Sequence, residues 1–276
     1  MIGRMSTDEL GQRLAALPRV RAIYTDLDGT LLGPRGSLLH GPDGRPSARA
    51  AEALVAAAAA GVEVIPVSGR QRKQLENDAR LMGLDDCVAE AGVVIVRDGV
   101  RHYEWGDLPR GLAGNPHDTM TEAGAVAVLL RAFPDDLRHY EPWHLDREGS
   151  HLFHGRVDVA AADRLLDEHG CSWASLIDNG DTGGWPGRSV RAYHLVPRGI
   201  DKARAVADDI QARGLRREET LGVGDSLADL AMAASVGTFV IVANGHGEAG
   251  DGVVRVDEAM GHGFAAAVEA ALSARR

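Results

Sequence analysis

The chain has 276 residues, of which 45% are hydrophobic and 25% are charged. A chain of this length and composition can bury a core in one large or two modest domains, which excludes a disordered chain and a fibre. Asp and Glu number 40 against 30 Lys and Arg, a formal net charge of −10, and this argues against general binding to nucleic acid or to an anionic membrane. Cys87 and Cys171 form neither a disulfide framework nor a zinc-type spacing, so we expect a reducing, cytoplasmic setting.

The first part of the chain predicts alternating helices and strands. Ser6 and Glu9 have the spacing of a capping box before an amphipathic helix, and no signal-peptide pattern is present. No apolar run reaches the roughly 18 residues that span a bilayer, so we expect a soluble protein. The elements that follow are a strand over 20–25, a helix over 47–60 and a strand over 62–67.

The last part of the chain repeats this alternation. The predicted elements are a helix over 201–213, a strand over 220–223, a helix over 227–234 and a strand over 238–242. Alternating strands and helices predict an α/β fold with a Rossmann-like parallel sheet and helices on both of its faces.

The composition changes between these two parts. Residues 99–187 carry all four Trp, several His, two helix-like stretches (121–132 and 157–169) and an extended stretch (172–177). We interpret this segment as an inserted α+β domain, with the core domain built from residues 1–98 and 188–276.

Two acidic residues follow the first predicted strand. Asp26 and Asp28 stand in the sequence Asp-Leu-Asp-Gly-Thr, at the carboxyl edge where open α/β sheets bind ligands. One carboxylate of such a pair can attack as a nucleophile while the other transfers a proton. A solvated turn is the plain alternative, whereas a calcium loop of the EF-hand type fails because Thr30 and Leu31 do not fit its pattern.

A second acidic pair, Asp225 and Asp229, follows the strand over 220–223. Oxygen ligands from Asp26 and Asp225, completed by water and a substrate phosphate, are what Mg²⁺ prefers. Crowding these carboxylates without a cation would be unfavourable because like charges repel. The pattern therefore predicts a magnesium site.

Two further segments are suited to binding phosphate. Ser68, Gly69 and Arg70 end the strand over 62–67 and offer a hydroxyl, backbone N–H groups and a guanidinium. Lys202 begins a predicted helix and can bring an ammonium to the same phosphate. Each signal is weak by itself, and a Lys at the start of a helix is usually solvated.

Taken together, these residues resemble the haloacid dehalogenase superfamily, most of whose members are Mg²⁺-dependent phosphohydrolases. Asp26 to Thr30 match its first motif, Ser68 its second, Lys202 its third, and Asp225 with Asp229 its fourth. An insert between the second and third motifs is similar to the C2-type cap of the Cof-like, sugar phosphate and phosphoglycolate phosphatases. Ala228 departs from the Cof-like pattern, which often has Asn at that position.

The resemblance implies a role for each matched residue. Asp26 would be the nucleophile that forms an aspartyl-phosphate, and Asp28 would protonate the leaving alcohol and then activate water. Ser68 and Lys202 would hold the phosphoryl oxygens. The metal site would use Asp26, the Asp28 backbone carbonyl and Asp225, while Asp229 would anchor a metal-bound water or Lys202.

Three more residues are assigned to substrate binding alongside Ser68 and Gly69. Thr30 belongs to the first motif, and Asn244 lies in a loop that borders the active site in similar proteins. Arg70 matches an arginine that often follows the second motif, where it either touches substrate or braces the loop.

Other patterns predict competing functions. Gly245 to Gly250 spell a dinucleotide fingerprint, but a turn follows where a helix is needed. Ser226 with Asp251 and His262 would form a hydrolase triad, although this leaves Asp26, Asp28 and Lys202 unexplained.

Within the insert, the histidines lack zinc spacing, and the tryptophans are more typical of a core than of a ligand platform. Its polar residues, among them Arg147, Arg156 and Asn179, would suit a hydroxylated substrate. The segment from Asp178 to Asp181 reads as a turn.

The sequence therefore predicts a Mg²⁺-dependent phosphatase that acts on a small phosphorylated metabolite, a sugar phosphate or a related polyol or acid. The expected protein is a monomer or homodimer with no nucleic-acid or membrane partner. A phosphomutase of the same superfamily and a catalytically weak phosphometabolite-binding protein are the alternatives.

Overall fold

The computed structural model describes residues 5–110, 114–183, 185, 187 and 189–274. The chain divides into two compact units, one made of Met1–Val67, Asp78–Cys87 and Lys202–Arg276, the other of Ser68–Asn77 and Val88–Asp201. The domain boundaries drawn from the sequence, 1–98 with 188–276 and 99–187, stay a prediction.

The first unit is built on a five-stranded parallel sheet. Its strands lie in the order β12 (Val253–Arg255), β11 (Thr238–Ile241), β10 (Thr220–Gly224), β1 (Ala22–Thr25) and β2 (Glu63–Pro66). Every residue of β1, β10 and β11 is buried. Continuous burial of this kind is typical of a parallel strand that is covered on both faces.

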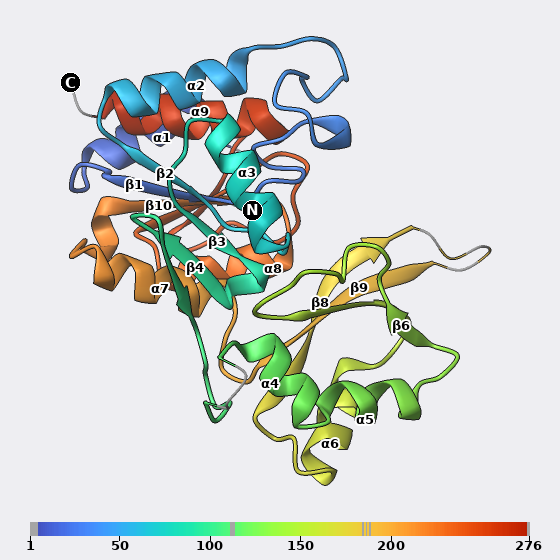
Figure 1. The fold of residues 1–276 in the computed structure, drawn as a ribbon. Coiled ribbons are helices and arrows are strands. Elements are labelled where there is room, and N and C mark those ends of the chain that lie inside the picture. The colour runs from blue at the N-terminus through green and yellow to red at the C-terminus, as the bar shows by residue number, and fades with distance from the viewer. Residues whose placement is uncertain (1–4, 111–113, 184, 186, 188, 275–276) are drawn as a thin grey trace. The chain divides into compact units, whose positions relative to one another are not determined.

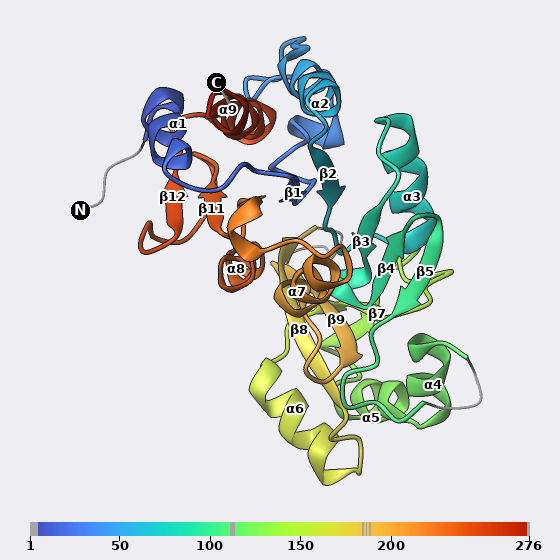
Figure 2. The ribbon, with the colours of Figure 1, turned by 90° about the vertical axis from the view of Figure 1, so that its left-hand side faces the viewer.

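Helices cover both faces of this sheet (Figure 2). One face carries α1 (Thr7–Ala15), α2 (Arg49–Ala59) and α9 (Met260–Ser273), in which α9 packs against the other two. The opposite face carries α7 (Lys202–Ala212) and α8 (Leu227–Leu230). The predicted capping box is confirmed, since Ser6 and Glu9 bond each other's backbone N–H at the start of α1.

The second unit has an antiparallel sheet (Figure 1). Its strands lie in the order β6 (Leu137–His139), β7 (His151–Gly155), β9 (Val190–Pro197) and β8 (Ala174–Thr182). This unit also contains α4 (Pro116–Glu122), α5 (Ala125–Ala132), α6 (Val159–Glu168) and the hairpin of β4 (Val94–Arg97) and β5 (Val100–Tyr103).

Two elements link the units along the chain. Strand β3 (Cys87–Ala89) joins the β4–β5 sheet, and α3 (Arg72–Leu81) begins in the second unit and ends in the first. The predicted class, a parallel-sheet core with an α+β insert, is confirmed. Among the described residues, no helix has the length and apolar character needed to cross a membrane.

Three local predictions are wrong. The helix expected over 121–132 is two helices, because Gly124 takes a left-handed conformation with φ +88° between α4 and α5. The helix expected over 227–234 is the short α8 followed by a 3₁₀ turn, Ala231–Ala234. The segment from Asp178 to Asp181 is not a turn but a bulge within β8.

Candidate active site

The two acidic loops begin at the carboxyl ends of neighbouring strands. In the register of β1 and β10, Thr25 lies opposite Val223, and the Asp26 backbone N–H donates to the Val223 carbonyl at 3.0 Å. Parallel strands end on the same edge of a sheet, so residues that follow β1 and β10 meet there. The prediction that Asp26 and Asp225 share one edge is confirmed by this pairing.

Lys202 joins this edge from the first residue of α7. Its Nζ donates to Asp26 Oδ1 at 2.8 Å and to Asp229 Oδ1 at 2.6 Å. The three residues are buried, with relative exposures of 7% for Lys202, 7% for Asp26 and 1% for Asp229. A buried ammonium shared by two carboxylates makes a rigid, charge-assisted unit.

Asp229 is held by its own helix. Its Oδ2 accepts from the backbone N–H and the hydroxyl of Ser226 at 3.0 and 2.6 Å, in a capping box at the start of α8. One oxygen thus caps the helix while the other binds Lys202. The structure therefore favours the second of the two roles considered for Asp229, that of anchoring Lys202.

Thr30 and Asn244 border Asp225. The Thr30 hydroxyl donates to Asp225 Oδ1 and the Asn244 amide to Asp225 Oδ2, each at 3.4 Å. Asn244 also donates to the Gly29 carbonyl at 2.9 Å and accepts from the Met260 backbone N–H at 2.8 Å. Both residues therefore bind the Asp225 carboxylate or its neighbouring loop. The sequence analysis assigned them to substrate binding and did not predict these contacts.

Burial and crowding govern the charges at this edge. Burial, then the charge of Asp229, raises the pKa of Asp26, and Lys202 opposes this rise. The same two causes raise the pKa of Asp225 to about 6. Burial acts to lower the pKa of Lys202, but Asp229 and Asp26 outweigh it and the pKa is raised, so the ammonium stays charged.

Three carboxylates and one ammonium are gathered at this edge. Ligand oxygens of Asp26, Asp225 and Asp229 lie within 4.8 Å of one another, which makes them a candidate metal site. When all four groups are ionised, they carry a net negative charge that a divalent cation would balance. Asp28 is an exposed residue in the loop that follows Asp26.

Ser68, Gly69 and Arg70 belong to the second unit. The Ser68 hydroxyl accepts from the Arg70 backbone N–H at 3.2 Å. The Gly69 carbonyl accepts from both terminal nitrogens of Arg147, at 3.2 and 3.1 Å. Arg147 was expected on a polar surface, but it is only 6% exposed. Its contact with Gly69, 78 residues away, could not be predicted from the local sequence.

The competing functions are not supported. The segment from Gly245 to Gly250 leads into β12 instead of a helix, so it lacks the helix N-terminus that a dinucleotide site needs. The Ser226 hydroxyl bonds to Asp229, whereas His262 Nε2 pairs with the Ser47 hydroxyl at 2.9 Å. A triad built on Ser226 and His262 is therefore wrong.

The aromatic residues of the insert have mixed roles. Trp105 and Trp173 pack against the core of the second unit, as expected, whereas Trp143 is 52% exposed. The guanidinium of Arg138 lies 4.0 Å from the ring centre of Trp185. Within the described parts of the chain, no group of three histidines has the geometry of a metal site.

Comparisons with known proteins show what the chain is similar to. The sequence profile of the haloacid dehalogenase-like hydrolases matches residues 188–251. The phosphoglycolate phosphatase of Pyrobaculum aerophilum is 28% identical over 254 residues, 92% of this chain and 96% of the relative. That of Methanoculleus marisnigri is 27% identical over 231 residues, 82% of this chain and 85% of the relative. The chain is therefore similar to the haloacid dehalogenase-like hydrolases over residues 188–251 and to these two phosphatases over most of its length.

A solved structure from Thermoplasma acidophilum matches the fold of this hydrolase with a TM-score of 0.61 and 22% identity, over 90% of this chain and 96% of that one. The predicted fold is thereby confirmed. The profile match and the relatives also confirm the prediction that the chain is an enzyme of the phosphatase class, a phosphoric monoester hydrolase.

Proposed function

We propose that this hydrolase is Mg²⁺-dependent and cleaves the phosphate monoester of a small metabolite through an aspartyl-phosphate intermediate. The observation that carries the proposal is the buried contact of Lys202 with both Asp26 and Asp229 beside Asp225. Phosphoryl transfer depends mainly on positioning and on stabilising charge, and these groups can supply both.

The substrate class remains that expected from the sequence, a sugar phosphate or a related phosphorylated polyol or acid. The relatives named phosphoglycolate phosphatase support the last of these. A short phosphorylated carboxylic acid is therefore the first compound to test.

In the proposed reaction, a carboxylate oxygen of Asp26 attacks phosphorus while the bond from phosphorus to the leaving oxygen breaks. Asp28 gives its proton to that oxygen, which leaves as an alcohol. Asp28 then takes a proton from water, and the water oxygen attacks phosphorus and releases Asp26 and inorganic phosphate. Lys202 and Ser68 each hold a phosphoryl oxygen.

The residues at the sheet edge fit a magnesium ion. Three carboxylates with clustered ligand oxygens form the hard, anionic donor set that Mg²⁺ prefers. Asp26, Asp225 and the Asp28 backbone carbonyl would hold the ion, and Asp229 would act through Lys202. When bound, the ion would neutralise charge on the phosphoryl group.

The test is phosphate release from a panel of phosphorylated acids, sugars and polyols, with Mg²⁺ or with EDTA. We expect Mg²⁺-dependent release that is lost in Asp26→Asn, while the circular dichroism of that variant is unchanged. Release that survives in Asp26→Asn would contradict the mechanism. An isomerised sugar phosphate without free phosphate would indicate the mutase instead, and binding without any product would indicate a binding protein.

A further inference from the structure

Residues Ser68 to Arg70 form a turn in the second unit. Their backbone carbonyls accept hydrogen bonds from two kinds of donor, backbone N–H groups and an arginine side chain. The Ser68 carbonyl accepts from the Ala91 backbone N–H at 3.2 Å, and the Arg70 carbonyl accepts from that of Glu90 at 3.0 Å. The Gly69 carbonyl between them instead accepts from the side chain of Arg147. The middle peptide of the turn is thus tied to a distant segment of the insert.

The guanidinium of Arg147 is committed to contacts within the protein. Besides Gly69, its Nε donates to the Trp143 carbonyl at 3.0 Å and its Nη1 to the Ser150 hydroxyl at 3.1 Å. Burial lowers its pKa to about 10, and Glu90, 4.0 Å away, opposes this. Arg147 is therefore charged at neutral pH, and its nitrogens make four hydrogen bonds to acceptors of the protein.

The geometry of the peptide bond connects Arg147 to Ser68. In a planar trans peptide the carbonyl and the following N–H point in opposite directions. Holding the Gly69 carbonyl therefore also fixes the Arg70 N–H, which donates to the Ser68 hydroxyl at 3.2 Å. Because that oxygen already accepts this bond, its own proton remains available to a phosphoryl oxygen.

We infer that Arg147 is a positioning residue that orients the Ser68 hydroxyl through the Gly69–Arg70 peptide. The inference rests on the proposed function, in which Ser68 binds a phosphoryl oxygen. Arg147 touches no substrate in this scheme. Its bidentate contact prevents the peptide from rotating, so that Ser68 is oriented before the substrate arrives.

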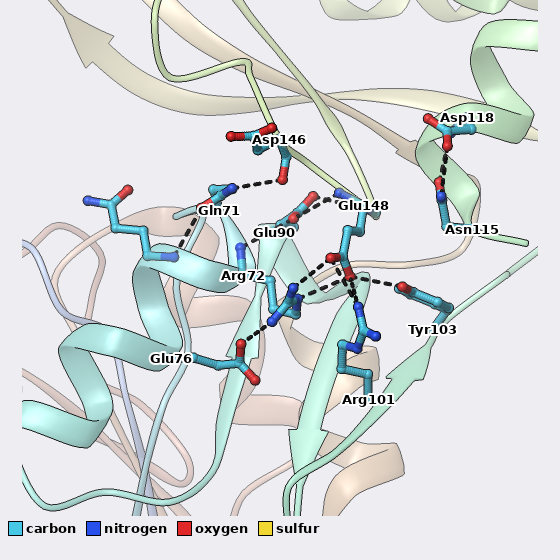
Figure 3. Close-up of polar contacts among 12 residues, drawn as sticks. Gln71, Arg72, Glu76, Glu90, Arg101, Tyr103, Asn115, Asp118, Asp146 and Glu148 are labelled. Atoms are coloured by element: carbon cyan, nitrogen blue, oxygen red, sulfur yellow. Dashed lines mark hydrogen bonds and ion pairs between the residues drawn. The ribbon is translucent and has the colours of Figure 1, made fainter.

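The segment around Arg147 is also held by contacts of Glu148 with Glu90 and Arg72 (Figure 3). The Glu90 carboxylate accepts from the backbone N–H groups of Arg72, Glu148, Gly149 and Ser150, at 3.3, 3.1, 2.9 and 2.9 Å. Arg72 also forms a bidentate ion pair with Glu148, at 3.0 and 2.6 Å. Replacing Arg147 should therefore free the Gly69 peptide without detaching the segment.

A double-mutant cycle on p-nitrophenyl phosphate tests the inference. We expect Arg147→Met to lower kcat/KM about tenfold in the wild-type background. In the Ser68→Ala background the same change should have less than about a twofold effect, because its route through Ser68 is gone. Equal losses in both backgrounds would overturn the proposal. Arg147→Lys, which keeps the charge but not the fork, should behave like Arg147→Met with a smaller loss.

Amide hydrogen exchange by NMR provides a readout that needs no activity. We expect the Arg70 amide to exchange faster in Arg147→Met, while the amides of Ser68 and Ala91 keep their protection. The control Ser150→Ala removes one acceptor of Arg147 but leaves Gly69 bound, and should match the wild type. Unchanged exchange at Arg70 would overturn the positioning role, whereas an inactive wild-type enzyme with faster exchange in the variant would refute only the proposed function.

Discussion

Gly29 lies directly against the carboxylate of Asp225. A Cβ at position 29 would come within 2.4 Å of Asp225 Oδ2, and Gly29 itself has φ +88°. Because Gly29 has no side chain, the loop after β1 leaves space for the Asp225 carboxylate of the loop after β10. Two loops that follow neighbouring strands are fitted to each other at the atom proposed to bind metal.

Gly29→Ala should lower both Mg²⁺ affinity and kcat/KM, by at least about tenfold, because the new methyl group displaces Asp225. The left-handed backbone should add a loss of about 1–2 kcal/mol in unfolding free energy. Mg²⁺ titration of phosphate release measures the first effect and urea unfolding the second.

Gly44→Ala provides the matched control for this change. Gly44 has φ +75° with nothing within 4 Å of the Cβ position, so it should lose stability without losing activity. Equal losses of activity in the two variants would show that backbone strain, and not the contact with Asp225, is responsible.

Asp28→Asn tests the acid–base role. The amide cannot deliver a proton to the leaving alcohol or take one from water, so both steps should slow by about 10²-fold or more. The loss should be smaller for a substrate such as p-nitrophenyl phosphate, whose leaving group needs little protonation. Rapid-quench measurement of the first turnover separates the steps; a change in Mg²⁺ affinity alone would assign Asp28 to metal binding.

Asp225→Asn tests the metal site. The variant keeps the size of the side chain but removes one negative charge from the cluster, so half-maximal activity should require at least about tenfold more Mg²⁺. Asp208→Asn makes the same change on α7, where the aspartate pairs with Arg204 at 2.6 Å. The control should leave the Mg²⁺ titration unaltered, and equal shifts in both variants would indicate only a general charge effect.

Stability should fall in acid because of the buried histidines of the second unit. The ring of His151 stacks on that of His117 at 3.9 Å, and its pKa lies well below the ordinary value because of burial, then the charge of His117. A lowered pKa in the folded state means that only the unfolded chain gains the proton as the pH falls below about 6.5. Unfolding free energy should then drop by up to about 1.4 kcal/mol per pH unit for this group.

Urea unfolding at pH 7.5 and at pH 5.5 measures this slope in the wild type and in His151→Gln. Glutamine does not titrate, so the variant should lose less stability between the two pH values, even where it is less stable at pH 7.5. Parallel losses in the two proteins would assign the acid sensitivity to other groups.

The sequence predicted the sheet and its acidic edge because both depend on local patterns. Apolar, β-branched runs marked β1 and β10, and the acids that follow each strand meet wherever parallel strands are paired. The position of Lys202 at the start of α7 followed from the same alternation. These features need no knowledge of contacts between distant side chains.

Features that depend on distant partners were missed. The Asp178–Asp181 segment has the composition of a turn, but Arg191 on β9 pairs with both aspartates and holds them in the strand. Arg147 was assigned to a surface because its neighbours in the sequence do not indicate that it is buried. Its contacts are with the distant residues Gly69 and Glu90. In both cases, tertiary contacts override the local pattern.

The two carboxylates that Lys202 joins come from segments far apart in the chain, since 176 residues separate Lys202 from Asp26 and 27 separate it from Asp229. No fragment that contains only one of these segments can assemble the cluster. Activity at this edge therefore depends on cooperative folding of the first unit. It should be lost at the same denaturant concentration at which the sheet unfolds, and not at a lower one.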